Sequence, residues 1–179
     1  MVFFIVGFMG AGKSSVGRKV ARRAGMRFVD IDAQVEQMHG ASVAEIFARE
    51  GEATFRKSER AALEQLAESD ENIVVSCGGG TPCSGNNMAL MNAVGKTIYL
   101  KLSPRRLAAR LRPGQTKRPI LRGLDAEQTL ALIMRILPER EPFYDQASMV
   151  VDCDTLGDDS ICACIAEYIR HHSGSAESR

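Results

Sequence analysis

Short apolar runs and longer segments of helical periodicity alternate along this chain. Five runs have the length and composition of β-strands: Val2–Val6 and residues 27–29, 73–75, 97–102 and 148–151. Between the first two runs, Lys13–Ala24 places apolar residues four positions apart, as on one face of a helix. Strands that alternate with helices predict a parallel sheet with helices on both faces. We therefore expect an α/β fold.

Two local patterns predict further helices. Ser42 is followed three residues later by Glu45, a capping-box signature that predicts the start of a helix. Near the C-terminus, Ile161, Ile165 and Ile169 recur every fourth position, as on the buried face of a helix. These patterns extend the alternation of strands and helices over most of the chain.

Two segments do not fit the alternation. Residues 112–125 combine prolines and glycines with basic residues, which predicts a mobile loop rather than a core element. Residues 172–179 are small and polar, and we expect them to form a disordered tail. No repeat or low-complexity linker divides the rest, so residues 1–171 are expected to form a single domain.

Composition limits the classes of function. A chain of 179 residues with 45% hydrophobic content is long enough for one buried core and short for two. The formal net charge of +1 offers no global electrostatic attraction for nucleic acid or an anionic membrane surface. No run of about 18 apolar residues is present, so the sequence supports neither a membrane span nor a signal peptide. We expect no nucleic-acid or membrane partner.

The cysteines indicate a reducing environment rather than a metal site. They are Cys77, Cys83, Cys153, Cys162 and Cys164. Their spacing matches neither a paired zinc pattern nor a redox pair with two intervening residues, so we interpret them as free thiols of a cytoplasmic protein. Cys162 and Cys164 resemble a metal pair, but helix positions two apart point about 200° away from each other. We expect both to be buried helix residues.

The strongest motif lies between the first apolar run and the first helical segment. Residues 7–14 read Gly-Phe-Met-Gly-Ala-Gly-Lys-Ser, the spacing of a Walker A phosphate loop. Glycines let successive backbone N–H groups turn toward phosphate oxygens, and the following helix directs its positive end at the same anion. Lys13 is then expected to reach the β- and γ-phosphates, and Ser14 to bind Mg²⁺. The alternative is a tight turn with an incidental lysine.

A phosphate loop is common to kinases, GTPases and motor ATPases, so other segments must separate these classes. The further motifs are Val29-Asp30-Ile31-Asp32, Phe55-Arg56-Lys57, Gly78-Gly79-Gly80, Arg118-Pro119-Ile120-Leu121 and Arg140 within Glu139-Arg140-Glu141-Pro142-Phe143-Tyr144. In this order and spacing they resemble shikimate kinase over nearly the whole chain. The resemblance implies a P-loop three-layer αβα fold like that of nucleoside monophosphate kinases. It also implies five parallel strands in the order 2-3-1-4-5 and a mobile lid at about residues 112–125.

The resemblance also implies an activity and its ligands. The reaction would transfer the γ-phosphoryl group of ATP, with Mg²⁺, to the 3-hydroxyl of shikimate. The products would be shikimate 3-phosphate and ADP, in the chorismate route to aromatic amino acids. The enzyme is expected to be a cytoplasmic monomer.

The resemblance assigns roles to individual residues. The residues implied for ATP binding are Gly10, Ala11, Gly12, Lys13, Ser14, Ser15, Arg110 and Arg118. Those implied for shikimate binding are Asp32, Arg56, Gly78, Gly79, Gly80 and Arg140. Lys13, Asp32 and Arg118 are implied as the catalytic groups. Ser14 and Asp30 are implied as metal ligands, with Ser76 near the water shell of the metal.

Two of these assignments concern neighbouring carboxylates. Asp30 and Asp32 lie two positions apart at a strand end, so both carboxylates are expected to project to the same side, next to the phosphate loop. The resemblance implies that Asp32 is the candidate general base for the attacking hydroxyl. The alternative is that Asp32 only caps a helix that begins near Ala33.

The arginines have alternatives as well. Arg56 and Arg140 fit a clamp on the substrate carboxylate, because a guanidinium matches a carboxylate bidentately. From local pattern alone, Arg56 could instead form an exposed i,i+4 pair with Glu52. Arg118 fits a lid cation that closes over the transferring phosphoryl group. Arg110 matches a position that packs on adenine, or else belongs to a solvated basic helix face.

Other features of the sequence disfavour three competing functions. A gluconate or nucleotide kinase of the same fold would share the phosphate loop, but the paired arginines and the triple glycine argue against it. A GTPase switch would carry an Asn-Lys-x-Asp motif, which this sequence does not contain. A relative that binds ATP without turnover is disfavoured by the intact set of Lys13, Ser14, Asp32 and Arg118.

Overall fold

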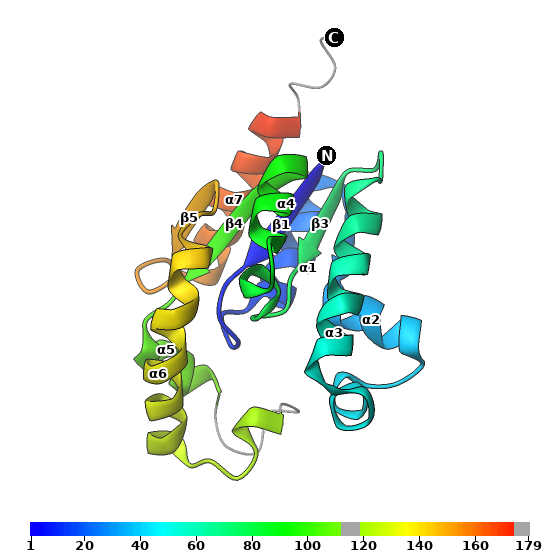
Figure 1. Cartoon of the computed structure of the whole chain (residues 1–179). Coiled ribbons are helices and arrows are strands. Elements are labelled where there is room, and N and C mark those ends of the chain that lie inside the picture. The colour runs from blue at the N-terminus through cyan, green and yellow to red at the C-terminus, as the bar shows by residue number, and fades with distance from the viewer. Residues whose placement is uncertain (112–118, 174–179) are drawn as a thin grey trace.

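The computed structural model describes residues 1–111 and 119–173. Its centre is a parallel five-stranded sheet in the order β2-β3-β1-β4-β5. The strands are β1 (Val2–Val6), β2 (Arg27–Asp30), β3 (Ile73–Ser76), β4 (Gly95–Lys101) and β5 (Met149–Asp152). The predicted α/β class and strand order are both confirmed (Figure 1).

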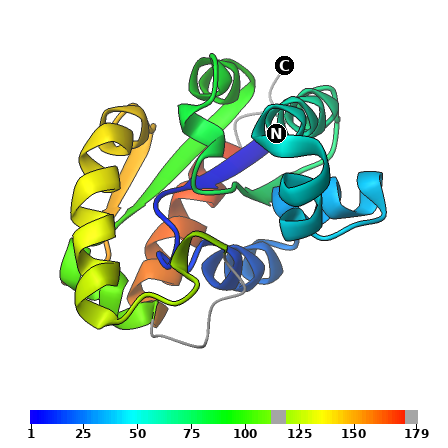
Figure 2. The same ribbon diagram turned by 60° about the horizontal axis from the view of Figure 1, so that its bottom comes forward.

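Helices cover both faces of this sheet. They are α1 (Lys13–Ala24), α2 (Ile31–His39), α3 (Val43–Ala67), α4 (Asn87–Val94), α5 (Pro104–Arg110), α6 (Ala126–Tyr144) and α7 (Asp158–Ser173). Short 3₁₀ turns occur at η1 (Thr81–Cys83) and η2 (Pro119–Leu121). Helices α1 and α7 pack together on one face, whereas α3 and α4 lie on the other and α6 runs beside β5 (Figure 2). Among the described helices, none is long and apolar enough to cross a bilayer.

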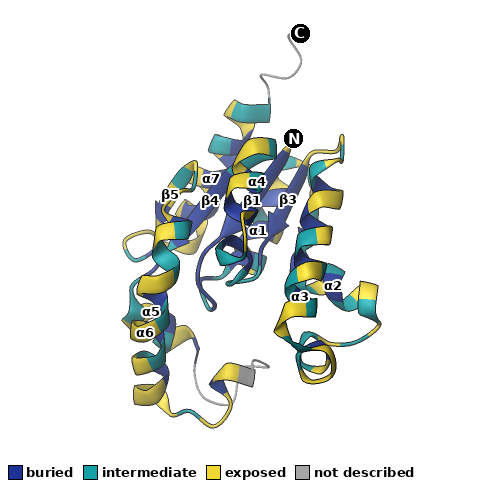
Figure 3. Ribbon diagram, viewed as in Figure 1, coloured by how far each residue is buried: buried dark blue, intermediate teal, exposed yellow. Residues whose placement is uncertain are grey.

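The central strand is buried along its whole length. All residues of Val2–Val6 are buried, and β1 pairs with β3 on one side and β4 on the other. Figure 3 shows the same distribution, with buried residues on the strands and exposed ones on the outer sides of the helices. A strand covered on both faces needs apolar residues at every position, which explains the unbroken run in the sequence.

Several element boundaries differ from the prediction. Strands β2 and β3 each extend one residue further, to Asp30 and Ser76, because these two residues continue the parallel pairing. Strand β4 begins at Gly95, two residues before the predicted start, and pairs there with Val2. The apolar pattern cannot mark such ends, because the end residues pair through the backbone.

The two segments predicted to lie outside the core are only partly described. Helix α7 continues through His172 to Ser173, so the prediction of a disordered tail is wrong for these two residues, and residues 174–179 lie outside the described part. Within the predicted loop of residues 112–125, residues 112–118 also lie outside it. The remainder forms η2 and ends at Asp125, whose side chain accepts a hydrogen bond from Gln128 N and caps α6.

The prediction that Cys162 and Cys164 are both buried is wrong for Cys164. Cys162 is buried in the core and Cys164 is exposed on α7. Two positions on a helix turn the side chains to nearly opposite sides, so one faces the sheet and the other faces solvent.

The predicted capping box starts α3. The Ser42 side chain accepts a hydrogen bond from Glu45 N at 3.3 Å, and the Glu45 carboxylate accepts one from Ser42 N at 2.8 Å. The helix is interrupted at Gly51, whose φ of 81° and ψ of 168° are not helical. The second part of α3, after Gly51, carries residues toward the carboxyl edge of the sheet.

Replacing Ser42 tests this cap. Ser42→Ala removes the acceptor for an N-terminal backbone N–H, and we expect the free energy of unfolding to fall by about 1 kcal/mol. Urea denaturation followed by circular dichroism measures the change. Ser42→Thr keeps a hydroxyl acceptor and is expected to stay near wild type. Equal destabilisation by the two variants would contradict the capping role.

Candidate active site

The phosphate loop connects β1 to α1 at the carboxyl edge of the sheet. Three of its glycines have positive φ: 138° at Gly7, 83° at Gly10 and 92° at Gly12. Other residues adopt such values with strain, so glycine is required for this path. The buried Lys13 curls back over the loop, and its Nζ donates to the carbonyl oxygens of Gly7 and Phe8 at 2.9 Å each. Its ammonium therefore lies at the loop that carries it.

Three side-chain oxygens meet beside the start of α1. Ser14 Oγ donates to Asp30 Oδ2 at 2.6 Å and lies 3.1 Å from Ser76 Oγ. Mg²⁺ prefers a few oxygen ligands and keeps water and phosphate oxygens in its remaining positions. Among the described residues, no group of three or more His, Cys, Asp or Glu side chains could hold a metal ion by itself. The donor set of Ser14 and Asp30 fits magnesium shared with a nucleotide. Ser15, which was predicted to bind ATP, is exposed.

The two neighbouring carboxylates do not share a strand face as expected. Strand β2 ends at Asp30, which is the N-cap of α2 and accepts a hydrogen bond from Asp32 N at 3.2 Å. Asp32 is therefore in the first helical turn, and the helix cap is Asp30. Asp30 faces Ser14, whereas a Cβ added to Gly78 would lie 2.8 Å from Asp32 Oδ1. The change from strand to helix directs the carboxylates to different neighbours.

Each residue of the triple glycine is close to a different group. A Cβ on Gly78 would meet Asp32, one on Gly79 would lie 3.5 Å from Arg140 Nη1, and one on Gly80 would lie 2.5 Å from Arg56 Nη2. None of the three has positive φ, so the demand for glycine here comes from space and not from backbone conformation. The turn after β3 thus brings together the side chains predicted to bind substrate.

Arg56 takes part in two ion pairs. Its Nε and Nη2 donate to Glu52 at 3.1 and 2.9 Å, and its Nη1 donates to Glu59 at 2.5 Å. The i,i+4 pair considered as an alternative is therefore present, but the side chain also lies against Gly80 and is only 23% exposed. Burial acts to lower the pKa of Arg56, and Glu59 and Glu52 outweigh it, so the pKa is raised. The guanidinium keeps its charge next to the glycine turn.

Glu59 is a functional neighbour that the sequence analysis missed. Its carboxylate is fully buried and accepts hydrogen bonds from Arg56 and from the buried Thr81 hydroxyl. Asn87 Nδ2 in turn donates to the Thr81 carbonyl at 2.9 Å. A buried charge is tolerated only when it is paired and hydrogen-bonded, as here. The only sequence signal is the i,i+3 spacing of Arg56 and Glu59, which is common on exposed helices.

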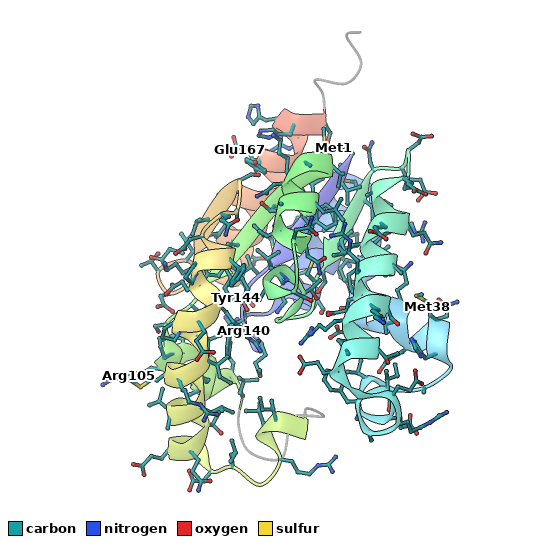
Figure 4. All side chains as sticks on the ribbon, viewed as in Figure 1. Met1, Met38, Arg105, Arg140, Tyr144 and Glu167 are labelled. Carbon is teal, nitrogen blue, oxygen red and sulfur yellow. The ribbon has the colours of Figure 1, made fainter. Side chains whose placement is uncertain are left out.

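Arg140 reaches the same region from the opposite side of the molecule. It lies on α6, and its guanidinium carbon is 5.6 Å from the ring centroid of Phe8 in the phosphate loop. That distance is within the range of a cation–π contact. Figure 4 shows Arg140 and Tyr144 on the side of α6 that faces the middle of the molecule, whereas Arg105 of α5 points outward. Arg140 therefore lies between the phosphate loop and the glycine turn.

The two remaining predicted arginines have different outcomes. Arg110 ends α5, and its Nη1 donates to the Ala11 carbonyl of the phosphate loop at 3.1 Å. Its Nη2 lies 3.7 Å from Asp158 Oδ1 at the start of α7. It is thus attached to the nucleotide side of the site. Arg118 lies outside the described residues.

A separate cavity of about 420 Å³ lies where α6 meets the ends of β4 and β5. Its lining includes Lys101, Met134, Glu141 and Asp154. Lys101 is already paired with Glu141 at 2.9 Å. None of the predicted site residues lines this cavity, so it is distinct from the candidate active site.

Comparison with known proteins identifies the family. The model of the family described as "Shikimate kinase" matches residues 9–170. The chain belongs to the shikimate kinase family. It is 44% identical over 153 residues to a shikimate kinase of Parabacteroides distasonis, which covers 86% of this chain and 88% of the relative. It is 42% identical over 155 residues to that of Bacteroides thetaiotaomicron, covering 87% and 88%.

Solved structures agree with this assignment. The crystal structure of shikimate kinase from Bacteroides thetaiotaomicron has a TM-score of 0.88 and 38% identity, covering 95% of this chain and 98% of that one. Shikimate kinase from Acinetobacter baumannii in complex with shikimate has a TM-score of 0.79 and 29% identity, covering 99% and 95%. A gluconokinase from Sinorhizobium meliloti, with a TM-score of 0.56 and 21% identity, shares the fold alone.

The contact between Gly80 and Arg56 yields a test of the site. Gly80 has φ of −95° and ψ of −14°, which alanine adopts without strain. The added methyl group of Gly80→Ala would therefore displace the flexible end of Arg56 rather than the backbone. We expect KM for the acceptor to rise about tenfold, as for a weakened charge-assisted hydrogen bond, and the melting temperature to fall because the buried Glu59 is less well paired.

The matched control is Gly157→Ala. No atom lies within 4 Å of the position that its Cβ would take, and its φ is not positive. We expect this variant to keep the wild-type KM. Steady-state kinetics and thermal denaturation of the two variants measure both quantities. A Gly80→Ala enzyme with unchanged KM would show that the position of Arg56 has no influence on the acceptor.

Proposed function

We propose that this chain transfers the γ-phosphoryl group of Mg²⁺-bound ATP to the 3-hydroxyl of shikimate. The products are shikimate 3-phosphate and ADP, and the reaction serves the chorismate route to aromatic amino acids. One observation carries the proposal: the turn Gly78-Gly79-Gly80 lies against Asp32, Arg140 and Arg56 and also against the phosphate loop. A Cβ on Gly79 would be 3.2 Å from Met9 N.

The acceptor side suits an acid that also carries hydroxyl groups. Arg56 lies next to Gly80 and Arg140 lies next to Gly79, and each offers a guanidinium to a carboxylate. Asp32 adds a carboxylate that accepts hydrogen bonds from hydroxyls. Shikimate has one carboxylate and three hydroxyls, which matches two cations and one anion.

The nucleotide side suits a triphosphate. The N–H groups of the loop from Gly10 to Gly12 and the start of α1 point their positive dipole ends at the phosphates. Lys13 adds a full positive charge to stabilise the transferring group. Ser14 and Asp30 would hold Mg²⁺, which neutralises charge on the phosphate oxygens.

The chemical step needs one proton acceptor. A bond forms between the 3-hydroxyl oxygen and the γ-phosphorus, and the bond from that phosphorus to the leaving oxygen of ADP breaks. We assign Asp32 as the general base, which takes the hydroxyl proton on a carboxylate oxygen. Arg118 is proposed as the cation that completes the charge stabilisation, and Arg110 as a contact to the adenine side.

Two finer points belong to the same proposal. We propose a monomer as the working unit on the basis of the family resemblance. A cytoplasmic location agrees with five free cysteines. Both stay predictions.

The acceptor can be identified directly. We expect Mg-ATP to yield ADP rapidly with shikimate, and slowly with gluconate, with a nucleoside monophosphate or with no acceptor. ADP release measured by a coupled assay, with an EDTA-treated sample without Mg²⁺, separates these cases. Stimulation by another acceptor would leave the nucleotide side intact and refute the shikimate assignment. Full activity without divalent metal would refute the role of Ser14 and Asp30.

The role of Asp32 can be tested by Asp32→Asn. This variant removes the proton acceptor and no phosphate contact, so we expect kcat to fall by about 10²- to 10⁴-fold with KM for ATP nearly unchanged. Asp70→Asn makes the same chemical change at an exposed position and is the matched control. Near-normal turnover of Asp32→Asn would eliminate the general-base role.

A further inference from the structure

Tyr144 connects two parts of the site that lie far apart in the sequence. Its hydroxyl donates a hydrogen bond of 2.5 Å to the carbonyl oxygen of Gly79, across a separation of 65 residues. Gly79 is the middle residue of the glycine turn, and Tyr144 ends the helix that carries Arg140. One bond thus connects the end of α6 to the turn between Asp32 and Arg56.

The ring of Tyr144 is held rigidly. The side chain is fully buried, and its ring packs on the buried Tyr99 of β4 with centroids 5.2 Å apart and planes inclined by 39°. A buried phenol must find a hydrogen-bond partner, and the Gly79 carbonyl supplies it. Burial raises the pKa of the phenol, so it stays protonated and remains a donor at neutral pH.

The helix around Arg140 needs an external tie. Pro138 and Pro142 lie inside α6, on either side of Arg140. Proline has no backbone N–H, so the carbonyls four residues before each proline lose their usual helical donors. The last turns of α6 are therefore held less firmly by their own hydrogen bonds. The bond from Tyr144 to Gly79 fixes this segment to the sheet edge instead.

We propose that Tyr144 is a positioning residue for the acceptor site, which sets Arg140 and the glycine turn at a fixed distance from each other. It touches neither substrate in this role. It acts by positioning Gly79 and Arg140. It thereby determines how the guanidinium groups of Arg56 and Arg140 can bind the carboxylate of the acceptor. This inference rests on the proposed function, because it assumes that Arg140 binds the acceptor.

Tyr144→Phe tests the inference because it keeps the ring and removes only the hydroxyl. We expect KM for shikimate to rise about five- to tenfold, the loss typical of one hydrogen bond. We expect kcat and KM for ATP to stay within about twofold, because the phosphate loop and Asp32 are not displaced. Steady-state kinetics with each substrate varied in turn gives the three constants.

Two controls separate positioning from a general loss of stability. Tyr168 lies on α7, and its half-buried phenol hydroxyl interacts with Ser148. Tyr168→Phe removes this hydroxyl and is expected to leave KM for shikimate unchanged. In an Arg140→Lys background, where the grip on the carboxylate is already weakened, Tyr144→Phe is expected to raise KM by a smaller factor. A smaller rise in KM in this background than in the wild type would indicate that Tyr144 acts through Arg140.

The outcomes are distinct. An unchanged KM for shikimate in Tyr144→Phe overturns the inference, as does an equal rise for ATP, an equal rise in Tyr168→Phe, or a full factor in the Arg140→Lys background. A wild-type chain that does not phosphorylate shikimate overturns the proposed function and this inference with it. If the wild-type chain phosphorylates shikimate and Tyr144→Phe has an unchanged KM for shikimate, this inference alone is overturned.

Discussion

The site depends on the absence of side chains at one turn. Where β3 ends, Gly78, Gly79 and Gly80 leave room for the side chains of Asp32, Arg140 and Arg56. A Cβ at Gly78 would press on Asp32 and Glu59, one at Gly79 on Met9 N, and one at Gly80 on Arg56. The parallel sheet places this turn beside the phosphate loop, because the carboxyl ends of neighbouring strands meet at one edge. Because the turn has no side chains, both the phosphate loop and the residues predicted to bind the acceptor can pack against its backbone.

A buried ion pair between Glu59 and Arg56 lies beside this turn. Glu59 is fully buried, and it stays acceptable because Arg56 and Thr81 donate to it. The same pairing keeps the Arg56 guanidinium near Gly80, where a rotatable side chain would otherwise sample many positions. Removing either partner of a buried pair leaves an uncompensated charge, so the two residues act as one unit. A flexible cation thereby becomes an ordered one before any ligand arrives.

The sequence predicted the fold better than it predicted the contacts. The strand order followed from motifs of known family spacing, and the phosphate loop followed from residues adjacent in the chain. Strand ends at Asp30 and Ser76 were missed because polar residues there pair through backbone atoms. The side chain of Cys164 was misplaced because both cysteines were assigned to the buried face, although residues two apart on a helix point about 200° from each other. Local patterns identify elements, and the direction of each face depends on packing.

The missed residues share one physical property. Glu59 and Thr81 are 22 positions apart, and Tyr144 and Gly79 are 65 apart, so no window of local sequence contains either pair. The separation of Arg56 and Glu52 is only four positions, and that pair was foreseen. Hydrogen bonds between distant segments depend on where the sheet edge brings the chain together. They are visible only once the fold is known.

Transfer of a phosphoryl group demands that donor and acceptor be set to within a fraction of an ångström. In this chain the phosphate loop and the acceptor site both contact the glycine turn. Met9 N of the phosphate loop lies against Gly79, and Phe8 lies beneath Arg140. The distance between the nucleotide side and the acceptor side is thus set by direct contacts of one turn. No long relay through the sheet is needed to keep the two sides in register.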